Sequence, residues 1–398
     1  MGSGGQAGFY LKMKADIELF VPLRLYSNHG KEHLAHRLKF KRMKRLFSLF
    51  ALLLLLFSSC AREKTQAELF AETKSGVVLI LNKFYYRIRL PNDKFLYFSG
   101  LDKDGDLENV TLDFNEIRKN CAWMSGTGFF VDDRGTIMTN RHVAQPALEE
   151  KDIKAGYRNF IHAIQQYYNY QKQQLSEKFD ELETAKGQYY DDEEEVLYDT
   201  PAGVAEIERQ QEALRREYAA AEQALAQLEQ LNDPSALKIS SVCELGIAYN
   251  DTHVTGAADF LDKNPCVVLR TSEREDVDLA LIQLKNQKTP DDAYVFSIGE
   301  ESTPLEMGQQ LYMIGYNAGP NLAQTRTGIQ VQMTGGKVTQ LSDGQRVLYD
   351  IATVQGSSGS PVIDTEGNLV AVNFAKLNGS DNFNFGIPLK RIKEFMKW

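Results

Sequence analysis

The sequence is poor in cysteine, in long apolar runs and in excess positive charge. Four cysteines among 398 residues are too few for a disulfide scaffold, and none has the CxxC spacing of a zinc or redox site. The 45 basic and 54 acidic residues give a net charge of −9, which argues against nucleic acid as a partner. The composition, 43% hydrophobic and 25% charged, excludes a multi-span membrane protein, a collagen and a wholly disordered chain. We expect neither a metal nor another cofactor.

The single apolar run covers residues 46–57, LFSLFALLLLLF, and is too short to span a bilayer as a helix. Basic residues precede it, and Ser58-Ser59-Cys60 follow. This arrangement suits the apolar region of a signal peptide. The segment 43–59 resembles a bacterial lipoprotein leader, with Phe57-Ser58-Ser59-Cys60 as the lipobox and Phe where Leu is usual. We therefore predict lipidation of Cys60 and a location in the bacterial cell envelope, anchored by lipid and facing the periplasm or the exterior.

The leader lies too deep in the chain if translation begins at Met1. A start at Met43 would give a short basic segment followed by the apolar run, so residues 1–42 are interpreted as a non-native upstream extension. The chain from Cys60 onward is still more acidic than the whole, and anionic lipid would repel it. A covalent anchor would then have to hold it at a membrane.

Short β-strand patterns dominate the rest of the chain. Residues 60–75 are polar and helix-prone and are interpreted as a tether with a short helix. From Gly76 onward, runs rich in Val, Ile, Tyr and Phe alternate with turn sequences such as Pro91-Asn92-Asp93 and Glu366-Gly367-Asn368. Many short strands with regular turns favour a β-barrel or a sandwich. The two β segments are 76–145 and 237–398.

Residues 146–236 have a helical pattern instead. One apolar stripe ends at Gly187, and a second follows Pro201, which suits the first position of a helix. The second stripe alternates steps of four and three, the spacing of a coiled-coil seam: Ile207, Gln211, Leu214, Tyr218, Ala221, Leu225 and Leu228. We predict an antiparallel helical hairpin inserted into a β domain. It is either a solvated spacer or an arm that binds a partner or a second copy.

Three histidines follow Cys60, and His142 differs from His162 and His253 in its surroundings. It comes directly after a predicted strand in Thr139-Asn140-Arg141-His142-Val143, a place where a rigid scaffold can hold a general base. Later in the chain, Gly356-Ser357-Ser358-Gly359 places a serine between glycines, where the hydroxyl can be exposed and backbone N–H groups can converge on one point. Asp278 immediately precedes an apolar strand, which could bury its carboxylate against an imidazole.

These three motifs occur in the order His, Asp, Ser, which is the chymotrypsin order. The blocks SGTGFF…TNRHV, DVDLALIQL and GSSGSP…NFGIP resemble the trypsin-like serine peptidases of the Deg (HtrA-like) type over about 76–145 and 237–398. The resemblance implies a double β-barrel. Two features depart from the family: the insert separates His142 from Asp278, and the chain stops soon after Pro388, so no PDZ domain is expected.

The resemblance also implies a role for each residue. Ser358 is the expected nucleophile, His142 the base and Asp278 the residue that orients it, with Asp276 as an alternative acid; the N–H groups of Gly356 and Ser358 form the oxyanion hole. The substrate pocket is expected at Ala352, six residues before the nucleophile, and at Asn373, Phe374 and Ala375, where a substrate strand would pair. A small uncharged Ala352 argues against cleavage after Lys or Arg.

We therefore predict a mainly β protein, a double β-barrel serine endopeptidase with a helical hairpin, acting on proteins or peptides. The alternative is a catalytically silent, protease-like platform that binds partners through the hairpin. A disulfide is a further prediction. Cys243 and Cys266 lie in neighbouring strand-like runs, and an exported protein meets oxidising conditions. Cys121 would stay free.

Overall fold

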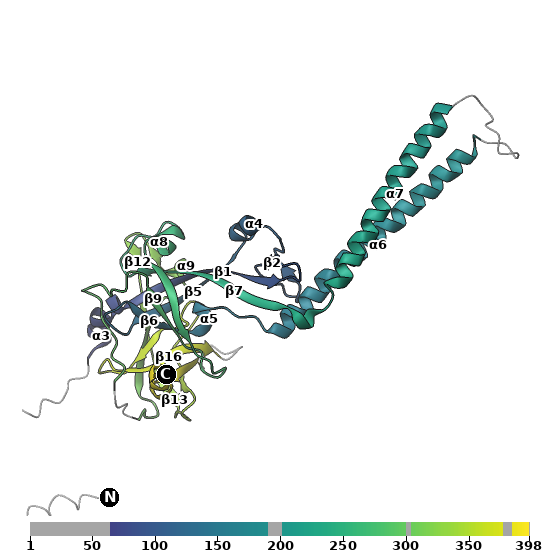
Figure 1. Cartoon of the computed structure of the whole chain (residues 1–398). Coiled ribbons are helices and arrows are strands. Elements are labelled where there is room, and N and C mark those ends of the chain that lie inside the picture. The colour runs from purple at the N-terminus through teal and green to yellow at the C-terminus, as the bar shows by residue number, and fades with distance from the viewer. Residues whose placement is uncertain (1–63, 190–200, 300–303, 377–383, 398) are drawn as a thin grey trace, which may run out of the picture. The chain divides into compact units, whose positions relative to one another are not determined.

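The computed structural model of the chain describes residues 64–189, 201–299, 304–376 and 384–397 (Figure 1). Residues Glu63–Trp398 form one structural unit. The predicted upstream extension 1–42, the leader 43–59, Cys60 and the acidic linker 191–195 lie outside the described residues. Within the described ranges, no helix is both long and apolar enough to cross a membrane.

The first barrel is built from strands on both sides of the helical insert. Its antiparallel strands follow each other in the order β1 (Val77–Arg89), β5 (Ala122–Phe130), β6 (Thr136–Thr139), β9 (Ala280–Leu284), β8 (Pro265–Thr271) and β7 (Lys238–Tyr249). Pairing of β1 with β7 closes the sheet into a barrel. The ladder between β6 and β9 matters most for function, because His142 follows β6 and Asp278 precedes β9.

The second barrel is formed by the C-terminal part of the chain. Its strands are β10 (Gln310–Gly315), β13 (Gln332–Gln340), β14 (Val347–Tyr349), β17 (Asn384–Pro388), β16 (Leu369–Lys376) and β15 (Pro361–Ile363), and β15 pairs with β10 to close it. The predicted double β-barrel is therefore confirmed. Peripheral elements complete the unit: β2 (Phe95–Phe98), β3 (Gly100–Leu101), β4 (Leu107–Glu108), β11 (Gln324–Thr325), β12 (Gly328–Ile329), α4 (Phe114–Lys119), α8 (Ala258–Leu261), α9 (Pro320–Ala323) and α10 (Leu389–Lys397).

One apolar cluster joins the two barrels. Phe129 and Met138 from the first barrel share it with Ile314, Tyr316 and Val372 from the second, and all five side chains are fully buried. Removing so much apolar surface from water is the main force that fixes one barrel against the other. The segments that carry the predicted catalytic residues lie along this junction.

The first strand is longer than the sequence pattern suggests. The pattern predicts separate strands before and after Asn82-Lys83, whereas β1 runs unbroken and pairs with β7 from Val78 to Arg89. Asn82 interrupts the apolar pattern but is fully buried, and its side-chain N–H groups find acceptors inside the protein.

The segment 60–75, interpreted as a tether with a short helix, does contain a short helix. Residues Gln66–Thr73 form α3, which begins with a capping box between Thr65 and Glu68. Residues Lys74–Gly76 form the 3₁₀ turn η1. The Lys64 N–H donates to the Thr365 carbonyl oxygen, 3.1 Å away, and Leu69 is fully buried in the cluster between the barrels. From Lys64 onward the chain is therefore part of the folded unit.

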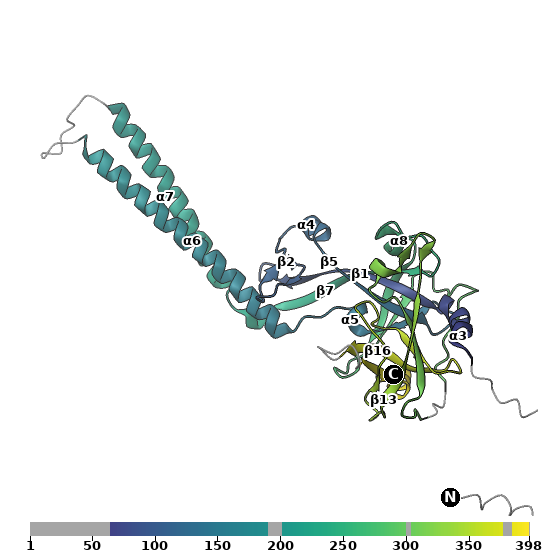
Figure 2. The ribbon, with the colours of Figure 1, turned by 180° about the vertical axis from the view of Figure 1, so that it is seen from behind.

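The insert is the predicted helical hairpin. Helix α6 spans Glu150–Gly187 and α7 spans Pro201–Gln230, so they end and begin at the predicted Gly187 and Pro201. Figures 1 and 2 show the two helices side by side. Lys172 Nζ lies 2.9 Å from Glu222 and Lys186 Nζ 2.8 Å from Glu208, which sets an antiparallel register. Every residue of the predicted α7 seam is buried or half-buried.

The hairpin begins and ends on an extension of the first barrel. There the outer halves of β1 and β7 pair beyond the barrel, β2 adds to β1, and η2 (Pro234–Ala236) leads from the hairpin into β7. Tyr157 of α6 is 1% exposed and packs with Tyr86 and Phe98, and its hydroxyl donates to the Leu231 carbonyl oxygen, 2.9 Å away. The two ends of the insert are thus held together at its base.

The predicted disulfide is wrong: Cys243 and Cys266 are both free, as is Cys121. On β7, Cys266 lies opposite Leu245, two residues away from Cys243. The two thiols pack in different apolar clusters. Burial raises the pKa of the Cys266 thiol to about 12, so this sulfur stays protonated.

Candidate active site

His142 is held at the end of the ladder that joins β6 and β9. Strand β6 ends at Thr139, and the short helix α5 (Arg141–Ala144) follows and carries His142. Asn82 of β1 fastens this helix, because its side-chain amide donates to the carbonyl oxygens of Val143 (2.8 Å) and Ala144 (3.1 Å). His142 itself keeps 40% of its side chain exposed. Its backbone is therefore fixed while its ring reaches solvent.

The Asp278 carboxylate contacts His142 twice. Its Oδ1 accepts the His142 backbone N–H at 3.0 Å, and its Oδ2 lies 2.5 Å from His142 Nδ1. Only 18% of the Asp278 side chain is exposed. A carboxylate on Nδ1 favours the tautomer with its proton there, which leaves Nε2 free to accept a proton. The pair is thus arranged as a base with its orienting acid.

The alternative acid, Asp276, lies elsewhere. Its carboxylate is half exposed and forms ion pairs with Arg274 (2.9 Å) and Arg391 (3.2 Å). The hydrogen bond from Arg274 lowers the pKa of Asp276. Asp278, and not Asp276, is therefore the carboxylate that the fold brings to His142.

Two neighbours of His142 hold Asp278 in turn. The Asn140 amide donates to the Asp278 carbonyl oxygen at 2.8 Å. The Arg141 guanidinium donates to the carbonyl oxygens of Ser272 (3.0 Å) and Arg274 (3.2 Å), in the loop that leads to Asp278. The sequence pattern includes Asn140 and Arg141 only as part of the motif and predicts no role for either. The one feature of the sequence that could have pointed to such a role is that both residues directly precede His142.

Ser358 lies on a tight double turn between β14 and β15. Gly356 and Gly359, on either side, have φ of 99° and 86°, a backbone region that favours glycine. The Ser357 N–H donates to the Val354 carbonyl oxygen, whereas neither the Gly356 nor the Ser358 N–H has a hydrogen-bond acceptor among the described residues. Two free donors beside a half-buried serine suit an oxyanion hole.

Thr127 of β5 ties this turn to the first barrel. Its N–H donates to the Ser358 carbonyl oxygen (2.8 Å) and its hydroxyl to that of Gly356 (2.9 Å). The hydroxyl of Thr139, three residues before His142, donates to the Thr127 carbonyl oxygen at 2.7 Å. Ser358 and His142 are therefore anchored to one residue, although no hydrogen bond joins their side chains in the described part of the chain.

The four predicted pocket residues differ in their environment. Ala352 is exposed. Asn373 is 2% exposed, and its side chain accepts from the Tyr349 hydroxyl (2.8 Å) and donates to the Ser357 carbonyl oxygen (3.0 Å), so it braces the serine turn. Phe374 is half-buried beside Phe385, and Ala375 lies in β16 opposite the same Phe385.

Within the described ranges, no three His, Cys, Asp or Glu side chains lie together as a metal site would require. The chemical groups that the fold does assemble are an imidazole with a free nitrogen, a carboxylate that orients it, and a serine beside two free N–H donors. This set is suited to nucleophilic attack on a carbonyl carbon.

The sequence model of the trypsin-like peptidase domain matches residues 126–372, more than half of the chain, and includes all three motifs. The chain belongs to the trypsin-like peptidase family. The family prediction is thus confirmed, and it places the protein among the serine peptidases.

Individual relatives are distant. Human serine protease HTRA4 is 25% identical over 167 residues, which cover 39% of this chain and 33% of the human protein. The chain thus spans about a third of the length of this curated relative. A solved serine endoprotease from Yersinia pestis aligns over 84% of this chain and 66% of its own, with 13% identity and a TM-score of 0.39.

Gly359→Ala tests the junction under the serine turn. A methyl group there would overlap the Thr127 carbonyl oxygen and lie 2.5 Å from Thr139 Oγ1. We expect the turn to shift and the labelling of Ser358 by a serine-directed fluorophosphonate to slow at least about tenfold.

Gly344→Ala is the matched control. Gly344 has a similar φ of 83° but open space around its Cβ position, so both variants carry the same backbone strain. Equal labelling rates in Gly359→Ala and Gly344→Ala would contradict the role given to this contact.

Proposed function

We propose that the protein is a serine endopeptidase that cleaves proteins or peptides through His142, Asp278 and Ser358. The observation that carries this proposal is the double contact of Asp278 with His142, one to the backbone and one to Nδ1. A surface aspartate that merely lies near a histidine would make a single contact with it. Two contacts fix both the position and the tautomer of the ring, which a base requires.

In the proposed mechanism, Ser358 Oγ attacks the scissile carbonyl carbon while His142 Nε2 takes the hydroxyl proton. The negative oxygen of the tetrahedral intermediate accepts hydrogen bonds from the Gly356 and Ser358 N–H groups. His142 then donates the proton to the leaving amine, and an acyl-enzyme on Ser358 remains. Water, deprotonated by His142, hydrolyses this ester and restores the serine. Asp278 stabilises the imidazolium in both steps.

The substrate is proposed to pair with β16. Strand β15 pairs with β16 only as far as Val372, whereas β16 continues to Lys376. The edge after Asn373 therefore has no strand on its β15 side within the described residues. An extended substrate can add there by backbone hydrogen bonds.

Envelope anchoring through Cys60 is a further part of the proposal and rests on the sequence of the leader. The role of the hairpin as a binding or self-association arm stays a prediction. Tyr167 and Tyr170 of α6 are 55% and 62% exposed, which leaves aromatic surface on this helix. The alternative, a catalytically silent platform, leaves the oriented His142 without a purpose.

Substitutions in the triad test the mechanism. Ser358→Ala and His142→Ala are expected to abolish turnover to a similar degree, because nucleophile and base act as a unit. Asp278→Asn is expected to lower kcat by about 10⁴-fold through the wrong imidazole tautomer. The measurement is hydrolysis of an unstructured protein, with circular dichroism as the folding control. Asp276→Asn, which removes the neighbouring carboxylate, should keep nearly full activity. Wild-type turnover by folded Ser358→Ala would exclude the mechanism.

Substrate preference tests the pocket. Ala352 has no charge with which to pair a basic side chain, so cleavage is expected after small or medium apolar residues. A peptide library read by mass spectrometry would measure this preference. Cleavage mainly after Lys or Arg would show that another residue forms the base of the pocket.

Cys60→Ser tests the anchor. The wild-type protein is expected in the membrane fraction with a lipid on Cys60, whereas the variant is expected without lipid and either uncleaved or soluble. Mass spectrometry of the N-terminal peptide and cell fractionation are the measurements. A wild-type protein that is soluble and carries no lipid would rule the anchor out.

A further inference from the structure

Strand β5 has an open edge that begins at the serine turn. Strand β6 pairs with β5 only at Phe129 and Phe130. At Thr127 the serine turn takes the place of a neighbouring strand, because the Ser358 carbonyl oxygen accepts the Thr127 N–H at 2.8 Å. Residues 122–126 pair with β1 on one side and have no strand on the other side among the described residues. The free edge therefore lies next to the proposed nucleophile.

The backbone groups of this edge point outward at every second residue. In an antiparallel pair of strands, the N–H and C=O groups point alternately toward the partner strand and away from it. The Thr127 N–H points away from β1, since it donates to Ser358, so the same groups of Ser125 and Trp123 also point away from β1. Neither residue makes a hydrogen bond on that side with the described part of the chain. Both can pair with an extended chain that leaves the active site.

Trp123 marks the outer end of this edge. Its side chain is 48% exposed, which leaves a large apolar surface in contact with water. Lys83 lies directly opposite on β1 and points to the same face of the sheet. Its Nζ lies 5.6 Å from the centre of the Trp123 ring. The ammonium group is therefore placed over Trp123, in the direction of the open edge.

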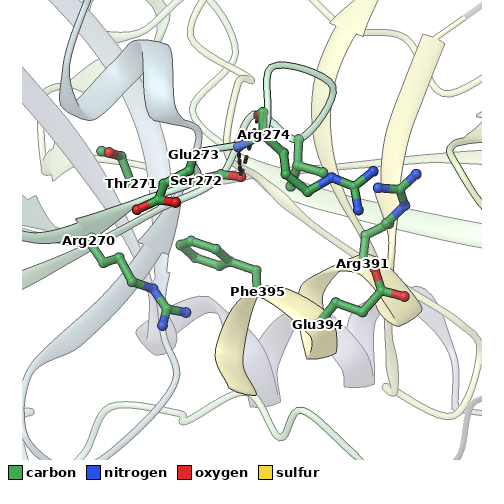
Figure 3. A pocket seen from close by; sticks show the side chains of 9 residues that line it. Arg270, Thr271, Ser272, Glu273, Arg274, Arg391, Glu394 and Phe395 are labelled. Atoms are coloured by element: carbon green, nitrogen blue, oxygen red, sulfur yellow. Dashed lines mark hydrogen bonds between the residues drawn. The ribbon is translucent and has the colours of Figure 1, made fainter. Parts of the chain in front are cut away.

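The Lys83 ammonium has no acidic partner among the described residues. Two other cations of the same unit are engaged. Arg391 lines a cavity of about 480 Å³ between α10 and the loop after β8 (Figure 3), and it pairs with Asp276 at 3.2 Å. Glu244 lies opposite Lys83 on β7, but it pairs with Arg118 at 3.3 Å. Lys83 Nζ makes neither an ion pair nor a hydrogen bond within the described ranges and is not a buried atom, so its charge is open to a ligand.

An acidic side chain on a strand beside β5 can reach this ammonium. Neighbouring strands lie about 4.8 Å apart, so such a strand lies roughly 10 Å from β1. Lys83 spans part of this distance, because its ammonium lies over the Trp123 ring. A residue opposite Trp123 points to the same face, and the length of a glutamate side chain covers the rest. Its carboxylate then meets the ammonium while its methylene groups pack on the indole.

The place of this residue in a substrate follows from the position of Ser358. With the serine turn opposite Thr127, the second residue after the scissile bond faces Ser125 and the fourth faces Trp123, since the residues of two paired strands advance in step. The third residue points to the opposite face of the sheet, away from Lys83. Recognition is thus expected at a single position of the substrate.

We propose that Lys83 and Trp123 select substrates that carry a glutamate four residues after the scissile bond. This selection rests on the proposed function and defines a substrate class for it. The chain has a net charge of −9 and therefore repels acidic substrates at long range. The preference then comes from contact with one unpaired cation, and not from the overall field of the protein.

Cleavage is measured with the full wild-type chain and a set of peptides with blocked ends. The reference is Ala-Ala-Val-Ser-Ala-Gln-Gln-Ala, with the cut expected after Val and confirmed by mass spectrometry. Glu in place of the second Gln, the fourth residue after the cut, is expected to raise kcat/KM about tenfold. Glu in place of the first Gln, the third residue, is expected to leave kcat/KM nearly unchanged. Equal values for all three peptides would overturn the proposal.

Two substitutions on β1 separate this contact from a general effect of charge. Lys83→Gln is expected to reduce the ratio of kcat/KM between the Glu and Gln peptides to about one. Arg87→Gln is the matched control and should keep the ratio. Arg87 faces the same side of β1, lies 4.6 Å from the centre of the Phe95 ring and forms no ion pair with the described residues, but it stands beyond the end of β5. A ratio that survives Lys83→Gln, or that falls equally in Arg87→Gln, would overturn the contact.

Binding without cleavage tests the contact independently of the proposed chemistry. In the full chain with Ser358→Ala, the peptide with Glu at the fourth residue is expected to shift the fluorescence of Trp123 to shorter wavelength. The blocked peptide Ala-Ala-Val-Ser-Ala-Gln, which ends at the third residue, should leave the fluorescence unchanged. Trp123→Phe in the same chain should remove the shift, which excludes Trp398, the other tryptophan, as its source.

The two measurements distinguish the contact from the proposed function. A wild type that cleaves no peptide, together with the expected shift in Ser358→Ala, would count against the proposed function and leave the contact as it stands. The absence of a shift at millimolar peptide, or the same shift from the shorter peptide, would overturn the contact whatever the wild type cleaves.

Discussion

The hydrogen bonds of Thr127 are the constraint on which the site depends. Its N–H and hydroxyl donate to the two ends of the serine turn, its hydroxyl accepts the Tyr316 N–H at 2.9 Å, and its carbonyl oxygen accepts from Thr139. The residue is fully buried. In so dry a place each lost hydrogen bond would leave an unsatisfied partner, so the two barrels have one favourable alignment at this point. That alignment sets where Ser358 stands relative to His142.

The four residues Thr139, Asn140, Arg141 and His142 act together as a second organiser. Thr139 donates to Thr127 on the neighbouring strand β5, Asn140 and Arg141 donate to backbone carbonyl oxygens at and before Asp278, and His142 contacts the Asp278 carboxylate. The segment therefore brings the base and also fixes the acid that orients it. A loop can vary in conformation, but the hydrogen bonds from Asn140 and Arg141 hold the loop that leads to Asp278 by its carbonyl oxygens.

Local signals in the sequence predicted local structure well. The limits of the helices at Gly187 and Pro201 follow from helix-ending and helix-starting preferences, and the glycines around Ser358 follow from the backbone that a sharp turn needs. Asn82 had no such signal. It looked like an interruption between strands because its partners lie about sixty residues away in the chain. The predicted disulfide was wrong because it, too, depended on residues that are distant in the chain: strand register decides which residues face each other.

The helical insert separates His142 from Asp278 in the chain and yet does not disturb their contact. A flexible insertion would raise the entropic cost of closing the loop between them, though only slowly with its length. In this chain the two antiparallel helices return the backbone to its starting point, and the bond from Tyr157 to Leu231 holds the two ends of the insert together. For the first barrel, the insert is therefore equivalent to a short connection between its two ends. The residues along the hairpin are free to serve another purpose without a change in the geometry of the base and the acid.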